Sequence, residues 1–79
     1  MTKYQLISSA RYRLENTFVL VCDCKKLLDY RLPKSAIRVL DALVDMYDEN
    51  QPVGLRNEGQ IITDLLAVGL IYRIALGKK

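Results

Sequence analysis

Apolar and polar residues alternate along the chain with helical spacing in three segments. In the first, apolar residues recur at intervals of seven positions: Ile7, Leu14, Val21 and Leu28. This spacing is typical of one face of a helix about four heptads long. Thr2, followed three residues later by Gln5, matches the capping box that begins many helices. We therefore expect a long N-terminal helix over residues 2–29.

Residues 17–22 carry a competing signal. This stretch, Thr-Phe-Val-Leu-Val-Cys, is β-branched, aromatic and apolar without interruption, as a buried strand would be. A strand there would break a heptad spacing that otherwise runs through it. The sequence favours the helix and leaves a strand over residues 17–22 as the alternative.

The second segment begins at Pro33, since proline is tolerated at the first position of a helix and disfavours helix just before it. One face is apolar and consists of Ile37, Leu40, Leu43, Val44 and Tyr47. The opposite face is charged and consists of Lys34, Arg38, Asp41, Asp45 and Asp48. Asn50, Pro52 and Gly54 follow and stop the helix. The pattern predicts an amphipathic helix over residues 33–49.

The third segment opens at Asn57, with Gln60 three positions later in a second capping-box arrangement. From residue 61 to residue 68 the apolar residues cover nearly the whole circumference of a helix. Such a helix must be buried on all sides, and a chain of 79 residues has little with which to surround it. Either a second copy of the chain covers it, or the chain turns at Gly69 and finishes as a short strand.

The three segments together predict the fold class. A chain of this length supports one hydrophobic core, so we expect a single domain over residues 1–79. The expected fold is all-α: a three-helix bundle with a long N-terminal helix, an amphipathic middle helix and an apolar C-terminal helix, the last helix optionally followed by a short strand.

Composition narrows the chemistry. The chain has no histidine, its three serines lie outside any G-x-S-x-G sequence, and no glycine-rich phosphate loop is present. Cys22 and Cys24 are separated by one residue, a spacing that strains a disulfide, and two thiolates are too few for zinc. We expect them to be buried structural thiols, with a redox role or a metal shared between two chains as the alternative. The protein is therefore predicted to be no enzyme and to need no cofactor.

Charge is segregated along the chain rather than evenly mixed. Residues 1–38 carry +5, residues 39–64 carry −5 and the last fifteen residues carry +3. A polarised surface of this kind can steer an oppositely charged partner or pair with its own copy. No signal-peptide layout and no apolar run of about 20 residues occurs, so we expect a cytoplasmic protein without membrane insertion.

The stretch from residue 37 to residue 79 resembles the later part of a winged-helix domain. The resemblance is carried by the sequence Val68-Gly69-Leu70-Ile71-Tyr72-Arg73-Ile74, which would form the turn into a wing strand. It implies DNA binding, with residues 61–67 as the DNA-reading helix. The basic residues that would contact nucleic acid are Arg56, Arg73, Lys78 and Lys79.

Two observations favour protein binding over this alternative. Only the seven residues 51–57 separate the second segment from the third, which leaves no room for the helix normally packed between them. The exposed positions of the expected reading helix also carry no Arg or Lys, so its attraction for phosphate would be weak. DNA binding by a winged-helix-like transcriptional regulator remains the second hypothesis.

The first hypothesis is a small regulatory protein that acts through protein–protein interaction. By analogy, such proteins are common in phages and mobile elements as adaptors or antagonists of transcription, replication or lysis. The expected partners are a second copy of the chain, in a homo-oligomer, and a protein target. The excess apolar surface of the third segment predicts the interface residues, which are Ile62, Leu66, Leu70, Ile71, Tyr72 and Ile74.

Overall fold

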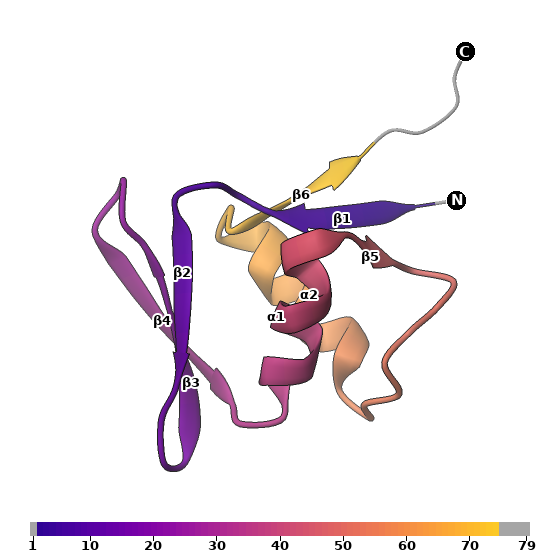
Figure 1. Cartoon of the computed structure of the whole chain (residues 1–79), viewed down its shortest axis with the longest axis horizontal. Helices are drawn as coiled ribbons and strands as arrows, with labels where there is room; N and C mark the ends of the chain where they lie inside the picture. Colours follow the sequence, from indigo (N-terminus) through magenta and orange to yellow (C-terminus); the bar gives the residue numbers. More distant parts are fainter. Residues whose placement is uncertain (1, 75–79) are drawn as a thin grey trace.

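A computed structural model describes residues 2–74 and shows a mixed α/β fold (Figure 1). Two helices of ten residues each are present in this part of the chain, together with six strands in two antiparallel sheets. The elements follow in the order β1 (Lys3–Leu6), β2 (Ala10–Leu14), β3 (Phe18–Asp23), β4 (Leu28–Pro33), α1 (Ala36–Asp45), β5 (Tyr47–Asp48), α2 (Glu58–Ala67) and β6 (Ile71–Ile74).

The two sheets differ in how the chain builds them. The first, which we call the hairpin sheet, has the order β2-β3-β4 and is a continuous meander. The second, which we call the terminal sheet, has the order β5-β1-β6 and joins strands from both ends of the described chain. Helix α1 lies between the hairpin sheet and β1, and α2 lies behind α1 in the view of Figure 1.

In the strands of the hairpin sheet, residues that face the core alternate with residues that face solvent. In β2 the basic residues Arg11 and Arg13 are exposed, whereas Ala10 is buried and Tyr12 is half-buried on the other face. In β3, Val19 and Val21 are completely buried, and they alternate with the half-buried residues Phe18, Leu20 and Cys22. A strand of this kind keeps one face on the core and one in solvent.

The predicted N-terminal helix over residues 2–29 is wrong, and with it the all-α three-helix bundle. The residues at seven-residue intervals fall in three successive strands: Leu14 ends β2, Val21 lies within β3 and Leu28 begins β4. Val21 is completely buried in β3, but Leu14 and Leu28 are 48% and 45% exposed in the neighbouring strands. The local alternation of basic and apolar residues in β2 therefore decides the structure, and the rejected alternative, a strand over residues 17–22, corresponds to β3.

The middle helix is present but shorter than predicted. It spans Ala36–Asp45 rather than residues 33–49, because Pro33 belongs to β4 and Met46 is already extended. Tyr47 then pairs with Tyr4 as part of β5, and the two rings lie 6.3 Å apart. Leu40 and Leu43 of α1 are completely buried, as the amphipathic pattern predicts. Val39, which the predicted face did not include, is also completely buried, whereas Val44 of that face is 49% exposed.

The C-terminal segment is a helix followed by a strand. Helix α2 begins at Glu58 and ends at Ala67, and the chain turns at Gly69, whose φ of +80° favours glycine. Strand β6 then pairs along its whole length with β1. This confirms the second of the two alternatives for the segment. The predicted capping box is absent, since Asn57 makes no side-chain cap and Gln60 donates to Asp64 instead.

Candidate binding groove

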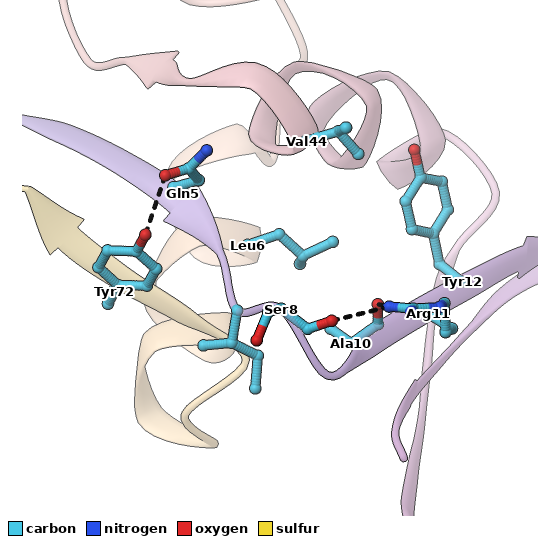
Figure 2. Close-up of a pocket in the computed structure, with 9 residues that line it drawn as sticks. Gln5, Leu6, Ser8, Ala10, Arg11, Tyr12, Val44 and Tyr72 are labelled. Carbon is cyan, nitrogen blue, oxygen red and sulfur yellow. Dashed lines mark hydrogen bonds between the residues drawn. The ribbon is translucent and has the colours of Figure 1, made fainter. Parts of the chain in front are cut away.

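A groove lies where the two sheets separate. The chain leaves β1 after Leu6 and enters β2 at Ala10, so the terminal sheet and the hairpin sheet diverge on either side of this connection. The space between them is bounded by β1, β2, α1 and β6 and has a volume of about 490 Å³ (Figure 2). Nine residues line it: Gln5, Leu6, Ile7, Ser8, Ala10, Arg11, Tyr12, Val44 and Tyr72.

The interior of this groove is mainly apolar. Leu6 from β1 and Val44 from α1 point into it, and the ring of Tyr12 stands opposite them on β2 (Figure 2). Val44 and Tyr72 are large apolar side chains, yet they are 49% and 46% exposed to solvent. Covering such side chains with a ligand would stabilise the complex, by roughly 1.5–3 kcal/mol for each aliphatic or aromatic side chain that becomes fully buried.

Two tyrosine hydroxyls at the rim are held by hydrogen bonds within the chain. The Tyr12 hydroxyl donates to Asp41 on α1 at 2.6 Å, and the Tyr72 hydroxyl donates to Oε1 of Gln5 at 2.9 Å. Burial, together with the bond to the Asp41 carboxylate, raises the pKa of Tyr12 to about 12, so its hydroxyl stays protonated at neutral pH. The rim tyrosines therefore serve as fixed walls.

Gln5 and Arg11 of the groove lining also make hydrogen bonds within the chain. Gln5 donates through Nε2 to the carbonyl oxygen of Asp45 at 2.9 Å, which ties β1 to the end of α1. Arg11 donates through Nη1 to the carbonyl oxygens of Ser8 and Ala10, both at 2.8 Å, which fixes the connection between β1 and β2. The lining carries the hydroxyl groups of Ser8, Tyr12 and Tyr72 and no carboxylate, thiol, imidazole or amine.

The edge of β2 that borders the groove at Tyr12 is free, and it continues beyond the groove lining to Leu14. Glu15 donates to Phe18 and Cys24 donates to Ser9 across the β2–β3 hairpin, which fixes the hydrogen-bonded pairs at odd positions of β2. Because bonded and non-bonded pairs alternate in an antiparallel ladder, Tyr12 and Leu14 direct their N–H and C=O groups away from β3. No strand within residues 2–74 pairs with β2 on that side.

The structure separates the predicted interface residues. Ile62, Leu70 and Ile71 are buried in the chain's own core, at 8%, 0% and 4% exposure. Leu66 and Ile74 are half-buried. Only Tyr72 is exposed, and it is the one member of the set that lines the groove. The sequence overestimated the exposed apolar surface because it did not anticipate the hairpin sheet and β1, which supply much of the missing core.

Two of the four predicted nucleic-acid contacts lie within the described residues. Arg56 is exposed in the loop before α2, and Arg73 is exposed on β6. Lys78 and Lys79 lie outside the described residues. The exposed side of α2 presents Gln60, Thr63 and Asp64 and carries no base. Residues 46–57 contain β5 and turns but no helix, so the helix that a winged-helix domain places there is absent from this segment.

The two cysteines are less buried than predicted. Both are free thiols, Cys22 half-buried on the solvent-facing side of β3 and Cys24 exposed just after it. Partial burial and the neighbouring Cys24 thiol raise the pKa of Cys22, which disfavours the reactive thiolate. Among residues 2–74, no three His, Cys, Asp or Glu side chains gather as a metal site would require.

Two buried carboxylates outside the groove each accept several hydrogen bonds, and sequence analysis missed both. Glu58 accepts the hydroxyl of Tyr47 and the backbone N–H groups of Val53, Gly54 and Leu55, the last three at 2.9–3.1 Å. Burial by itself would raise the pKa of Glu58, but these four donors lower it below its ordinary value. The run of loop residues immediately before an acidic helix start was the available signal.

Asp23 has the same function in the turn between β3 and β4. Its carboxylate accepts the hydroxyl of Ser9 at 2.9 Å and the backbone N–H groups of Lys25 and Lys26. Burial would raise the pKa of Asp23, yet these hydrogen bonds and the nearby ammonium group of Lys26 lower it. The turn also places Leu27 at a φ of 59°, a left-handed conformation that this carboxylate helps to hold.

Comparisons with known proteins give no relative: no family model matches the chain, and no curated protein or solved structure is similar to it. Neither helix that the structure describes in residues 2–74 has the length and apolar character needed to cross a membrane.

Proposed function

We propose that this protein is a non-enzymatic interaction module that binds an extended, apolar segment of a protein target in the groove between its two sheets. The observation that carries the proposal is the coincidence, at one place, of exposed apolar side chains and an unpaired strand edge. Val44 and Tyr72 supply the apolar surface, and Tyr12 and Leu14 supply outward backbone groups. Strand addition to a free edge uses these two components together.

The chemistry of the groove supports binding rather than turnover. Each polar side chain of the lining other than Ser8 already has a partner within the chain, so its position is set before a ligand arrives. Pre-organised walls lower the entropy that binding must offset. An extended segment would pair its backbone with Tyr12 and Leu14 and place alternate side chains against Leu6 and Val44.

Charge gives the target a preference. Arg11 lies at the groove with its guanidinium on two carbonyl oxygens, and the carboxylate of Asp41 on α1 accepts the Tyr12 hydroxyl at the rim. A segment with apolar residues at alternate positions and a basic residue toward α1 matches this arrangement. Such rim charges set orientation and association rate more than affinity.

The test uses peptides selected from a displayed random library against the whole protein. We expect the selected peptides to carry apolar residues at alternate positions and to bind in the groove. The variant Val44→Lys places a charge in the groove and suits the C-terminal turn of α1 electrostatically. It should weaken these peptides by roughly tenfold or more, since a tenfold change corresponds to about 1.4 kcal/mol. Fluorescence anisotropy with labelled peptide measures the affinity.

The matched control is Thr63→Lys, which introduces the same charge on the exposed side of α2, away from the groove lining. This variant should bind the selected peptides as the unmodified protein does. Peptides that bind Val44→Lys as tightly as the unmodified protein would remove the groove from the proposal. Amide spectra of both variants establish that each retains the native fold.

A further inference from the structure

The opposite edge of the hairpin sheet, β4, is open and regular. Because Leu20 and Cys22 direct their backbone groups toward β2, Val19, Val21 and Asp23 direct theirs toward β4. Their partners on β4 are Leu32, Tyr30 and Leu28. The N–H and C=O groups of Asp29 and Arg31 therefore point away from β3, and no strand of residues 2–74 accepts them.

The side chains of β4 alternate between two kinds of surface. Asp29 and Arg31 are exposed on the outer face of the sheet, where the Arg31 guanidinium lies 4.8 Å from the centre of the Phe18 ring. Leu28, Tyr30 and Leu32 occupy the inner face, and Leu28 is 45% exposed. Below them, a cleft of about 210 Å³ separates β4 from Leu65 and Val68 at the α2 side.

We propose that the β4 edge is a self-association surface, at which β4 pairs antiparallel with β4 of a second copy about a two-fold axis through Tyr30. In this register Asp29 lies opposite the partner subunit's Arg31, and Arg31 lies opposite the partner subunit's Asp29. Each of these two pairs has its backbone groups turned outward, so each forms the two hydrogen bonds of a bonded pair. Opposite charges at directly opposed positions stabilise a sheet.

The inner face fits the same register. Leu28 lies opposite the partner subunit's Leu32, and Tyr30 lies opposite the partner subunit's Tyr30 at the axis. These are non-bonded pairs, in which side chains approach more closely than in bonded pairs. The half-exposed apolar row of β4 is thus covered by an identical row, which a two-fold interface requires.

Other registers of the β4–β4 pairing lose backbone hydrogen bonds or bring like charges together. A shift by one residue in the pairing would oppose outward groups to inward ones and lose the ladder. A shift of the axis to Arg31 would place two guanidinium groups opposite each other and would pair Asp29 with Pro33, which has no N–H to donate. A shift to Asp29 would oppose two carboxylates. Only the axis at Tyr30 satisfies backbone and charge together.

The proposed pairing does not depend on the binding groove. The groove borders β2, the other edge of the same sheet, so a dimer through β4 would hold six hairpin-sheet strands in one continuous sheet with a groove near each end. Two grooves on one particle would bind a target with two copies of its segment more tightly than one groove does.

Charge exchange tests the register. At tens of micromolar, sedimentation equilibrium should give a dimer for the unmodified chain. The variant Asp29→Arg opposes two arginines, and Arg31→Asp opposes two aspartates, so each variant alone should be a monomer at the same concentration. An equimolar mixture of the two should form a heterodimer, because both of its opposed pairs are then of opposite charge. The double variant Asp29→Arg with Arg31→Asp should again be a dimer.

Hydrogen exchange adds a readout that simple loss of folding would not give. The amides of Asp29 and Arg31 should exchange at least tenfold more slowly in the dimer than in either monomeric variant. The control Thr63→Lys, on the exposed side of α2, should remain a dimer. An unmodified chain that is a monomer under these conditions, or single variants that dimerise as the unmodified chain does, would overturn the proposal.

Discussion

The hairpin sheet and the terminal sheet differ in the sequence separation of the strands that pair. In the hairpin sheet each strand pairs with its neighbour in sequence, and short turns close the loops. In the terminal sheet β1 pairs with two strands that lie more than 40 residues away along the chain. Closing such long loops costs more entropy than closing a hairpin. The terminal sheet therefore needs support from outside its own ladder.

That support comes from the buried carboxylate of Glu58. It joins Tyr47 of β5 to the loop that precedes α2, and so links one edge of the terminal sheet to a helix. Asp23, by contrast, holds a turn inside the hairpin sheet and reaches only to Ser9 next to it in space. The terminal sheet is therefore stabilised by a contact to a distant helix, whereas the hairpin sheet is stabilised by a contact within its own turn.

The largest expected effect is therefore at Glu58. The substitution Glu58→Ala leaves the Tyr47 hydroxyl and three backbone N–H groups without their acceptor in a buried site. Each unsatisfied buried donor costs about 1–3 kcal/mol, and water entering the site recovers part of this. We expect the free energy of unfolding to fall by about 3 kcal/mol, measured by urea denaturation.

The matched control for this prediction is Glu49→Ala, which removes an exposed carboxylate from the neighbouring loop. It should change the free energy of unfolding by no more than about 0.5 kcal/mol. Equal losses in the two variants would mean that Glu58 acts only as surface charge, and the contrast between the two sheets would fail.

Protonation at acid pH should remove the stability that the Glu58 and Asp23 carboxylates contribute. The pKa of Glu58 in the folded protein is lower than its ordinary value of 4.5, so the folded state binds fewer protons there than the unfolded state. The stability from this group is complete above the ordinary value and is lost as the pH falls through the lower, folded pKa. Asp23, whose pKa is also lowered, contributes in the same direction below its ordinary value of 3.8.

We therefore expect the urea midpoint of the unmodified protein to fall between pH 6 and pH 3. In Glu58→Gln the midpoint should start lower and fall less steeply, since the group that titrates is gone. Parallel pH profiles for the two proteins would contradict the assignment of the lowered pKa to Glu58.

The smallest expected effect is at Asp23. The substitution Asp23→Asn can keep an oxygen at the Oδ1 position, which accepts from all three donors, but it removes the negative charge that strengthens these bonds. The change should be confined to the β3–β4 turn, because its partners are all within or beside that turn. We expect faster amide exchange at Lys25 and Lys26 and little change in β1, α1 or α2. Asp45→Asn, in which the exposed carboxylate of α1 is neutralised, is the control.

The helical half of the chain was predictable because its signals are local. The apolar face of α1 and the turn at Gly69 each depend on a few neighbouring residues, and the structure has a helix and a strand where they indicate. Pro33, predicted as the first residue of the middle helix, is instead the last residue of β4. The ends were less predictable, since pairing of Tyr47 with Tyr4 shortens α1 from a distance.

The strand-rich half was mispredicted because two periods coexist in it. A spacing of seven between Leu14, Val21 and Leu28 fits a helix, and it also fits three successive short strands. The local alternation of Arg11 and Arg13 with apolar residues was the stronger indicator. A continuous apolar run in β3 agrees with it, because β3 is the central strand of its sheet.

The groove itself could not be found from sequence. Its lining combines β1, β2, α1 and β6, and only Tyr72 belongs to a segment that the apolar pattern marked as an interface. Val44 appeared in the pattern as a residue of the helix core, but it sits where the two sheets diverge and is half exposed. The exposure of a side chain such as Val44 depends on how helices and strands pack together, and a short-range sequence pattern carries no information about that packing.

The most direct test of the binding groove is amide exchange in the presence of a selected peptide. If the peptide adds to the edge of β2, the amides of Tyr12 and Leu14 should exchange at least tenfold more slowly in the complex than in the free protein, because a new strand covers them. The amides of Asp29 and Arg31, on the other edge of the same sheet, should be unaffected by the peptide. Slower exchange at Asp29 and Arg31, with Tyr12 and Leu14 unchanged, would contradict the account and place the peptide on β4.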